Sequence, residues 1–238
     1  MNAVALPVAV PEHLTPPWLT AALGKEVLTA TATPVGTGQM GACYRIELTG
    51  DPDLPTTVLA KLPTTDPATR SFLHGSYATE VTFYRELLPT VAVSAPVAYY
   101  AEISDDPEQR GTFTLLLEDL APADQGDQIA GCSVEQAQAM LENVAGLHAP
   151  RWSDPTLLGV GGLALSTKDD ADLLDQIFPD AVETALERLD PLVPDEDAAL
   201  LRKVAPHAGR WSTARPQRYA VVHGDYRLDN LMLHPDGR

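Results

Sequence analysis

The sequence predicts an α+β fold, in which an N-terminal antiparallel sheet with an accompanying helix is followed by a mainly helical second half. About five short stretches between residues 25 and 118 are rich in Val, Thr and other aliphatic residues and end at Gly, Pro or Asp, as strands do. Residues 76–89 instead repeat apolar side chains at helical spacing. After residue 132, N-cap residues precede long amphipathic stretches, which predict helices.

The first elements are a short helix, a strand and a glycine-rich loop. Thr15 precedes "PPWLTAAL" and is a suitable N-cap for a helix ending near residue 23. Residues 27–35, "VLTATATPV", are typical of a strand. Gly36, Gly38 and Gly41 then follow in the pattern G-x-G-x-x-G.

The residues after this glycine pattern indicate which fold it belongs to. In a dinucleotide-binding fold the pattern opens a helix, whereas here "CYRIEL" continues as an alternating strand. A glycine loop between two strands is typical of a loop that folds over nucleotide phosphates. An ordinary hairpin turn is the alternative.

Lys61 and Glu80 are candidate partners of opposite charge. Lys61 lies inside the apolar strand "TTVLAKLP", and a buried ammonium costs several kcal/mol unless it is paired. On the helix predicted for residues 76–89, Glu80 shares the apolar face with Tyr77, whereas Glu86 points elsewhere. We therefore expect Lys61 to pair with Glu80. The alternatives are an edge-strand lysine facing water and a solvated glutamate.

The remaining elements are two strands and several helices. Strands are expected at residues 94–103 and from residue 112 to Glu118. Helices are expected at residues 133–149, 166–189 and 195–211. A capping box of Ser133 and Gln136 opens the first of these helices, and Pro179 is expected to interrupt the second.

The segment from Tyr219 to Leu233, "YAVVHGDYRLDNLML", carries the strongest chemical signal. It predicts a strand, a polar loop and a second short strand. His223, Asp225 and Asn230 stand in the pattern H-x-D-x-x-x-x-N, which a phosphoryl-transfer loop needs. The carboxylate accepts the proton of an attacking hydroxyl, and the amide oxygen holds a metal ion. The alternative is a polar surface turn.

Composition narrows the classes of partner. The 238 residues carry 33 acidic and 16 basic side chains, a formal net charge of −17. Such a surface repels nucleic acids and anionic membranes, so we expect neither as a partner.

The two cysteines lack metal-type or disulfide spacing. Neither a signal peptide nor a membrane-spanning stretch is evident, and we expect a cytoplasmic protein. The sequence predicts no oligomeric state.

The "HGDxxxxN" loop resembles the catalytic loop of the aminoglycoside phosphotransferase and choline kinase-like family, within the protein-kinase-like fold. It looks most similar to the branch of ecdysteroid kinase-like proteins, and Gly224 stands where protein kinases carry Arg. The resemblance implies two lobes: an N-terminal nucleotide-binding lobe at residues 1–120 and a C-terminal helical lobe at residues 121–238. The hinge between them, where main-chain groups near Glu118 and Leu120 meet adenine, follows from the same resemblance.

The resemblance also implies an activity: ATP-dependent, magnesium-assisted phosphoryl transfer to a hydroxyl group of a small molecule. Asp225 would be the catalytic base, with His223 bracing the catalytic loop, and Asn230 would bind Mg²⁺. Lys61, oriented by Glu80, would hold the nucleotide phosphates. Gly36, Gly38 and Gly41 would cover those phosphates.

The C-terminal end departs from the family pattern. In that family a return strand follows the loop and carries an aspartate, which is the other magnesium ligand. In this sequence no residues match that strand, because the segment "LMLHPDGR" is its last one. We therefore expect a piece of a longer phosphotransferase with an incomplete C-terminal lobe. A nucleotide-binding pseudokinase or inactive fragment is the alternative. A metal-dependent hydrolase using His223, Asp225 and His234 is a second one.

Overall fold

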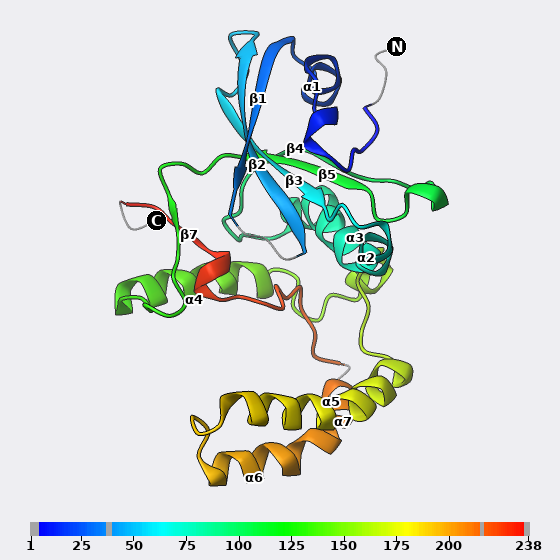
Figure 1. Ribbon diagram of the computed structural model, residues 1–238, viewed down its shortest axis with the longest axis vertical. Coiled ribbons are helices and arrows are strands. Elements are labelled where there is room, and N and C mark those ends of the chain that lie inside the picture. Colours follow the sequence, from blue (N-terminus) through cyan, green and yellow to red (C-terminus); the bar gives the residue numbers. More distant parts are fainter. Residues whose placement is uncertain (1–4, 37–39, 215–216, 236–238) are drawn as a thin grey trace. The chain divides into compact units, whose positions relative to one another are not determined.

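The computed structural model describes residues 5–36, 40–214 and 217–235 of the chain, and its contacts divide the chain into two compact units (Figure 1). The first unit comprises Met1–Arg151, Val160–Gly162 and Val221–Arg238. The second comprises Trp152–Gly159 and Leu163–Ala220. The sheet and the loop with His223, Asp225 and Asn230 therefore belong to the same unit.

A five-stranded antiparallel sheet forms the centre of the first unit, with the strand order β1-β2-β3-β5-β4. This confirms the predicted α+β class with an N-terminal antiparallel sheet. The strands are β1 (Val27–Val35), β2 (Gly41–Gly50), β3 (Thr57–Pro63), β4 (Ala98–Ile103) and β5 (Phe113–Glu118).

The two faces of the sheet bury different apolar clusters because side chains alternate along each strand. Val58, Ala60 and Leu62 of β3 contribute to a cluster that includes Leu19 of helix α1 (Pro16–Leu23). The opposite cluster joins Phe113, Leu115 and Leu117 of β5 to helix α3 (His74–Thr82), which follows the short helix α2 (Pro67–Phe72). Figure 1 shows α1 and α3 on opposite sides of the sheet. Lys61 lies between Ala60 and Leu62 in β3, so its side chain points to the opposite face of the sheet, which is the face that packs against α3.

Helix α3 differs from the uniform helix expected for residues 76–89. The α-helix ends at Thr82 and continues as a π-helical turn, Phe83–Leu87, and a 3₁₀ turn, Leu88–Thr90. In the π turn, the Leu88 N–H donates to the Phe83 carbonyl, five residues back. The wider turn shifts the buried face, so Leu87 is almost completely buried, whereas Leu88 is only half-buried.

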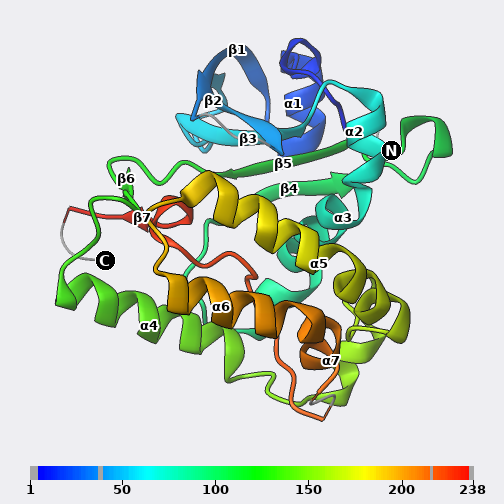
Figure 2. The ribbon, with the colours of Figure 1, turned by 60° about the horizontal axis from the view of Figure 1, so that its bottom comes forward.

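Helix α4 (Val134–His148) belongs to the same unit and follows the sheet in the chain. The predicted capping box at its start is present: the Gln136 N–H donates to Ser133 Oγ, and the Ser133 N–H donates to Gln136 Oε1. The short strands β6 (Asp124–Gln125) and β7 (Met232–Leu233) pair in antiparallel fashion. Figure 2 shows β6 and β7 next to each other, with α4 following β6 in the chain. The end of the chain thereby returns to the segment that follows β5.

The second unit is helical and consists mainly of α5 (Lys168–Leu189), α6 (Asp195–Val204) and α7 (Ala208–Ser212) (Figure 2). The expected interruption at Pro179 is wrong, because α5 continues through this residue. A proline removes one backbone donor, and the hydrogen bonds on either side can hold the helix together. The helix expected for residues 195–211 is instead divided by the 3₁₀ turn Ala205–His207, which contains Pro206.

Short 3₁₀ helices complete the description of the two units. Besides those already named, they are Pro11–His13, Pro107–Gln109, Pro155–Gly159 and Leu228–Asn230. The described residues contain no helix both long and apolar enough to cross a membrane.

Candidate functional site

Lys61 and Glu80 form the expected ion pair. Lys61 Nζ donates to Glu80 Oε1 at 2.6 Å and to Glu80 Oε2 at 2.8 Å. The period of β3 directs Lys61 towards α3, and the helical period of α3 places Glu80 between the buried Tyr77 and Val81. Glu86, by contrast, is exposed. About a third of each side chain in the pair is accessible to water, so its contribution to folding is small and its main effect is to orient the ammonium.

Two ionisable groups lie close to this ion pair. Cys43 of β2 is directly opposite Lys61 of β3. Burial raises the pKa of the Cys43 thiol, and the Lys61 charge only partly opposes that effect. Burial, together with the Glu80 carboxylate, also raises the pKa of Tyr84. Both groups are therefore neutral at pH 7, and the charges at this position are those of Lys61 and Glu80.

The glycine-rich loop connects β1 to β2. Gly36 has a positive φ of 72°, a conformation that glycine adopts without strain. At Gly41 a Cβ atom would lie 2.6 Å from the Leu62 carbonyl oxygen, so β2 can approach β3 here only without a side chain. Tyr77 of α3 donates a hydrogen bond of 2.5 Å to the Met40 carbonyl, which ties the end of the loop to the helix that carries Glu80. Gly38 lies outside the described residues.

The expected hinge follows the end of β5. The Glu118 N–H donates to the Val97 carbonyl at 2.8 Å, and the Leu120 carbonyl accepts from the Ala123 N–H at 2.9 Å. Between these residues Asp119 accepts two hydrogen bonds from Arg45 of β2, at 2.6 and 3.1 Å. The Asp119 side chain is only 6% exposed, and the bond from Arg45 holds its pKa below the usual value. This pair attaches the segment that follows β5 to the sheet, and no sequence pattern predicted it.

Asp225 and Asn230 are in direct contact in the catalytic-type loop. Asn230 Nδ2 donates to Asp225 Oδ2 and to the Asp225 carbonyl, each at 2.9 Å. Asp225 Oδ1 lies 3.1 Å from Arg227 Nε, and the Asp225 side chain is 63% exposed. His223 Nδ1 accepts from the Asp225 N–H at 3.3 Å, so the imidazole braces the turn. The carboxylate is held from both sides and still faces solvent.

Several residues that sequence reasoning missed hold this loop in place. Tyr226 donates from its hydroxyl to the Met140 carbonyl of α4 at 2.9 Å. The Gln128 N–H donates to Asp229 Oδ1 at 3.0 Å, and Gln128 Oε1 accepts from the Leu228 N–H at 2.9 Å. These partners lie 86 to 101 residues apart in the chain, so a local pattern could not have revealed them.

Oxygen atoms of Asp225 and Asn230 suit a hard cation such as Mg²⁺. The amide nitrogen of Asn230 donates its hydrogen bonds to Asp225, so the amide oxygen of Asn230 points away from that contact. This orientation leaves the oxygen available as a metal ligand. Among the described residues there is no group of three or more His, Cys, Asp or Glu side chains that could hold a metal ion. The described residues thus do not form the His223, Asp225 and His234 cluster that the hydrolase alternative requires.

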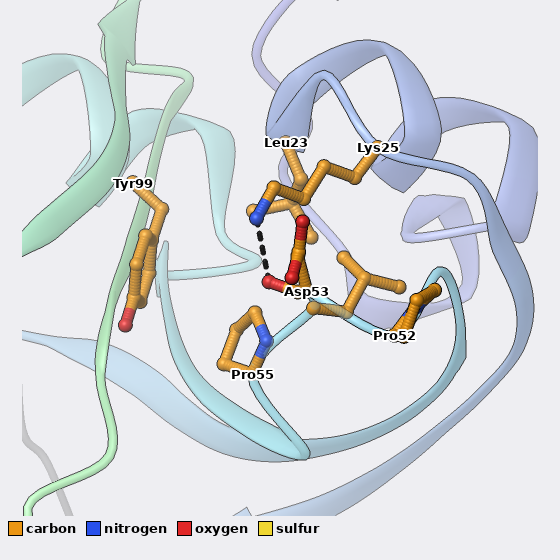
Figure 3. Close-up of a pocket in the computed structure, with 7 residues that line it drawn as sticks. Leu23, Lys25, Pro52, Asp53, Pro55 and Tyr99 are labelled. Carbon is orange, nitrogen blue, oxygen red and sulfur yellow. Dashed lines mark hydrogen bonds between the residues drawn. The ribbon is translucent and has the colours of Figure 1, made fainter.

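A pocket of about 350 Å³ lies elsewhere in the first unit (Figure 3). Lys25 Nζ donates to the Asp53 carbonyl at its centre, at 2.5 Å, and the ring of Tyr99 forms one wall. Its lining residues are Leu23, Lys25, Pro52, Asp53, Leu54, Pro55 and Tyr99. None of the motif residues lines this pocket.

Comparison with known proteins identifies the family. The model of the phosphotransferase enzyme family matches residues 56–238. The chain belongs to the phosphotransferase enzyme family. The match includes Lys61, Glu80 and the loop from His223 to Asn230, whereas Gly36 and Gly41 precede it. No curated protein matches the chain.

Membership of the phosphotransferase enzyme family agrees with the geometry of the first unit. Phosphoryl transfer of the kinase type uses a cation to hold phosphates and a loop carboxylate to activate the acceptor. The family match therefore assigns the chain to phosphotransferases of the kinase-like type.

Proposed function

We propose that the protein is an ATP-dependent, magnesium-assisted kinase that phosphorylates a hydroxyl group of a small molecule. One observation carries this proposal: the Asp225–Asn230 pair belongs to the same compact unit as the bidentate Lys61–Glu80 pair. Each pair supplies one of the two needs of phosphoryl transfer, activation of the acceptor and neutralisation of phosphate charge. The family match supports the reaction class.

In this proposal Asp225 is the catalytic base. Its carboxylate is exposed enough to reach an acceptor hydroxyl, and contacts with Arg227 and Asn230 restrict its rotation. His223 supports the turn through its contact with the Asp225 N–H. When bound, Mg²⁺-ATP supplies the phosphoryl group together with the charge neutralisation that its transfer requires. The Asn230 amide oxygen is the ligand that the loop offers to the metal ion.

The nucleotide would bind to residues of the sheet. Lys61 would contact the phosphates in the orientation that Glu80 imposes. Gly36, Gly38 and Gly41 would form the cover, and the absence of a side chain at Gly41 keeps the base of that cover close to β3. Main-chain groups near Glu118 and Leu120 would meet adenine. In the two-lobe division that we propose, residues 1–120 bind the nucleotide and residues 121–238 contribute the catalytic loop.

The acceptor is proposed as a small molecule and not a macromolecule. A net charge of −17 disfavours nucleic acid and anionic membranes, and a cytoplasmic location remains our proposal. The ecdysteroid kinase-like branch is likewise a proposal, because it rests on the loop sequence "HGDYRLDN".

The test is ATP consumption by the purified full-length protein with a library of hydroxylated metabolites. Product should appear with at least one acceptor, should need Mg²⁺, and should be lost in Asp225→Asn. Nucleotide affinity is measured in parallel by calorimetry. ATP binding without turnover for any acceptor would favour the pseudokinase alternative, and absence of both would overturn the proposal.

A further inference from the structure

We propose that Gln128 is a positioning residue for the catalytic loop, acting through the main chain of Leu228. This inference rests on the proposed function, because it concerns how the loop with Asp225 and Asn230 is held. Gln128 lies between β6 and α4, a hundred residues before Leu228 in the chain. It forms hydrogen bonds with Leu228 and Asp229, which lie between Asp225 and Asn230 in the chain.

The need for an external partner comes from the turn itself. Leu228–Asn230 is a single 3₁₀ turn, and its N-cap residue, Arg227, makes no side-chain capping bond. The Leu228 N–H at the start of that turn has no acceptor within it. Leu228 is buried, whereas Gln128 is exposed and the bond between them is part-buried, so losing this bond would cost part of the free energy of an unmade buried hydrogen bond.

Gln128 provides the missing acceptor. Its Oε1 atom accepts from the Leu228 N–H at 2.9 Å, while its own N–H donates to Asp229 Oδ1 at 3.0 Å. Gln128 therefore forms hydrogen bonds with two consecutive residues of the turn, Leu228 and Asp229. Leu228 is three residues after Asp225 and two before Asn230, so a displacement of the turn would move the base and the metal ligand relative to each other.

Neighbouring contacts keep Gln128 in register with the loop. Gln125 Nε2 donates to the Asp229 carbonyl, and the Gly126 N–H donates to the Leu231 carbonyl at 3.0 Å. At Gly126 a Cβ atom would lie 2.7 Å from the Leu228 carbonyl oxygen, so the two segments approach as closely as their main chains allow. None of these contacts uses the side chain of Gln128, so we expect them to persist when only that side chain is changed, which makes its contribution measurable.

Two substitutions with side chains of similar length distinguish the effect of the hydrogen-bond acceptor from the effect of side-chain volume. Gln128→Met fills the same space with a sulfur that is a weak acceptor, and Gln128→Glu retains an oxygen acceptor. Gln138→Met is the matched control, since the Gln138 side chain on α4 is exposed and donates a hydrogen bond to the exposed Glu142 on the same helix. For Gln128→Met we expect kcat to fall by about tenfold, with the KM for ATP changed by less than about twofold. Gln128→Glu should retain kcat within about threefold of the wild type, and Gln138→Met should not differ from it.

Hydrogen exchange gives a readout that does not depend on turnover. In Gln128→Met the Leu228 amide should exchange at least about tenfold faster, and Gln128→Glu should restore its protection. Unchanged exchange and unchanged kcat in Gln128→Met would overturn the inference while leaving the proposed kinase activity in place. Equal loss of kcat in both Gln128 variants would also overturn it, since the acceptor would not be the cause. An inactive wild type with the expected exchange pattern would count against the proposed function instead.

Discussion

Lys61 Nζ lies within 2.8 Å of both carboxylate oxygens of Glu80, and this contact joins the central strand β3 to helix α3. The contact depends on the phase of two elements at once, because a shift of one residue in either would turn one side chain away. It is therefore a sensitive marker of how α3 is placed against the sheet. In the proposed kinase it also sets the direction of the ammonium that meets the phosphates.

Replacing Lys61 tests that role. Lys61→Ala should lower kcat/KM for ATP by about 10²-fold, because an oriented charge at the phosphates is lost. The free energy of unfolding should change by less than about 1 kcal/mol, since the pair is partly exposed. Lys25→Ala, which removes a lysine from the pocket of Figure 3, is the control and should retain activity. Steady-state kinetics and urea unfolding measure both, and a large stability loss in Lys61→Ala would indicate a structural lysine.

Asp225→Asn separates catalysis from binding. The variant keeps the shape of the side chain but cannot accept the hydroxyl proton, so turnover should fall by about 10²-fold or more. ATP affinity, measured by calorimetry, should stay within about threefold of the wild type. Wild-type turnover in this variant would show that the loop is not the catalytic centre.

Asn230→Ala should act through the metal ion. The amide oxygen is the proposed magnesium ligand, and the amide nitrogen makes two bonds to Asp225. Activity should therefore require about tenfold more Mg²⁺ for half-saturation, and excess Mg²⁺ should restore only part of kcat. A magnesium titration of activity checks this, and an unchanged half-saturation point would remove Asn230 from the metal site.

Asp119→Asn should make the free energy of unfolding less dependent on pH in the acidic range. The bond from Arg45 lowers the pKa of Asp119 in the folded state, below the value of about 3.9 in an unfolded chain. The ionised carboxylate therefore stabilises the fold above the unfolded pKa, and this stabilisation is lost as the pH falls towards the folded pKa. At pH 7 the variant should be less stable by about 1 kcal/mol, a value reduced by the exposure of Arg45. Urea unfolding at pH 7 and pH 3 measures the difference, which should shrink at pH 3.

Gly41→Ala should destabilise the sheet. Its new methyl group would lie 2.6 Å from the Leu62 carbonyl oxygen. Because the backbone fixes the position of Cβ and the oxygen is itself a backbone atom, β2 and β3 would have to move apart. We expect a loss of about 1–3 kcal/mol. Gly75→Ala is the matched control: it lies in α3 with open space around its Cβ position and should be neutral or stabilising. Equal melting temperatures for the two variants would contradict the close approach at Gly41.

Local sequence was sufficient for the elements whose contacts repeat at short range. The alternation of β3 assigned Lys61 to one face, and the helical spacing of α3 assigned Glu80 to the side that meets it. The capping box of Ser133 and Gln136 was predicted for the same reason, because its partners are three residues apart. The pattern His223–Asp225–Asn230 indicated a phosphoryl-transfer loop, which agrees with the family that matches the chain.

Tertiary structure alone decided how the loop from His223 to Asn230 and the segment that follows β5 are held. The contacts of Gln128 with Leu228 and of Arg45 with Asp119 join residues 100 and 74 positions apart. The π turn at Phe83–Leu87 and the passage of α5 through Pro179 likewise departed from what local spacing predicted. Propensity and periodicity depend on neighbours within a few residues, whereas these features depend on which distant segments pack together. The sequence by itself therefore predicted the type of chemistry that we propose for the loop, and the packing of the chain determined which residues hold that loop in position.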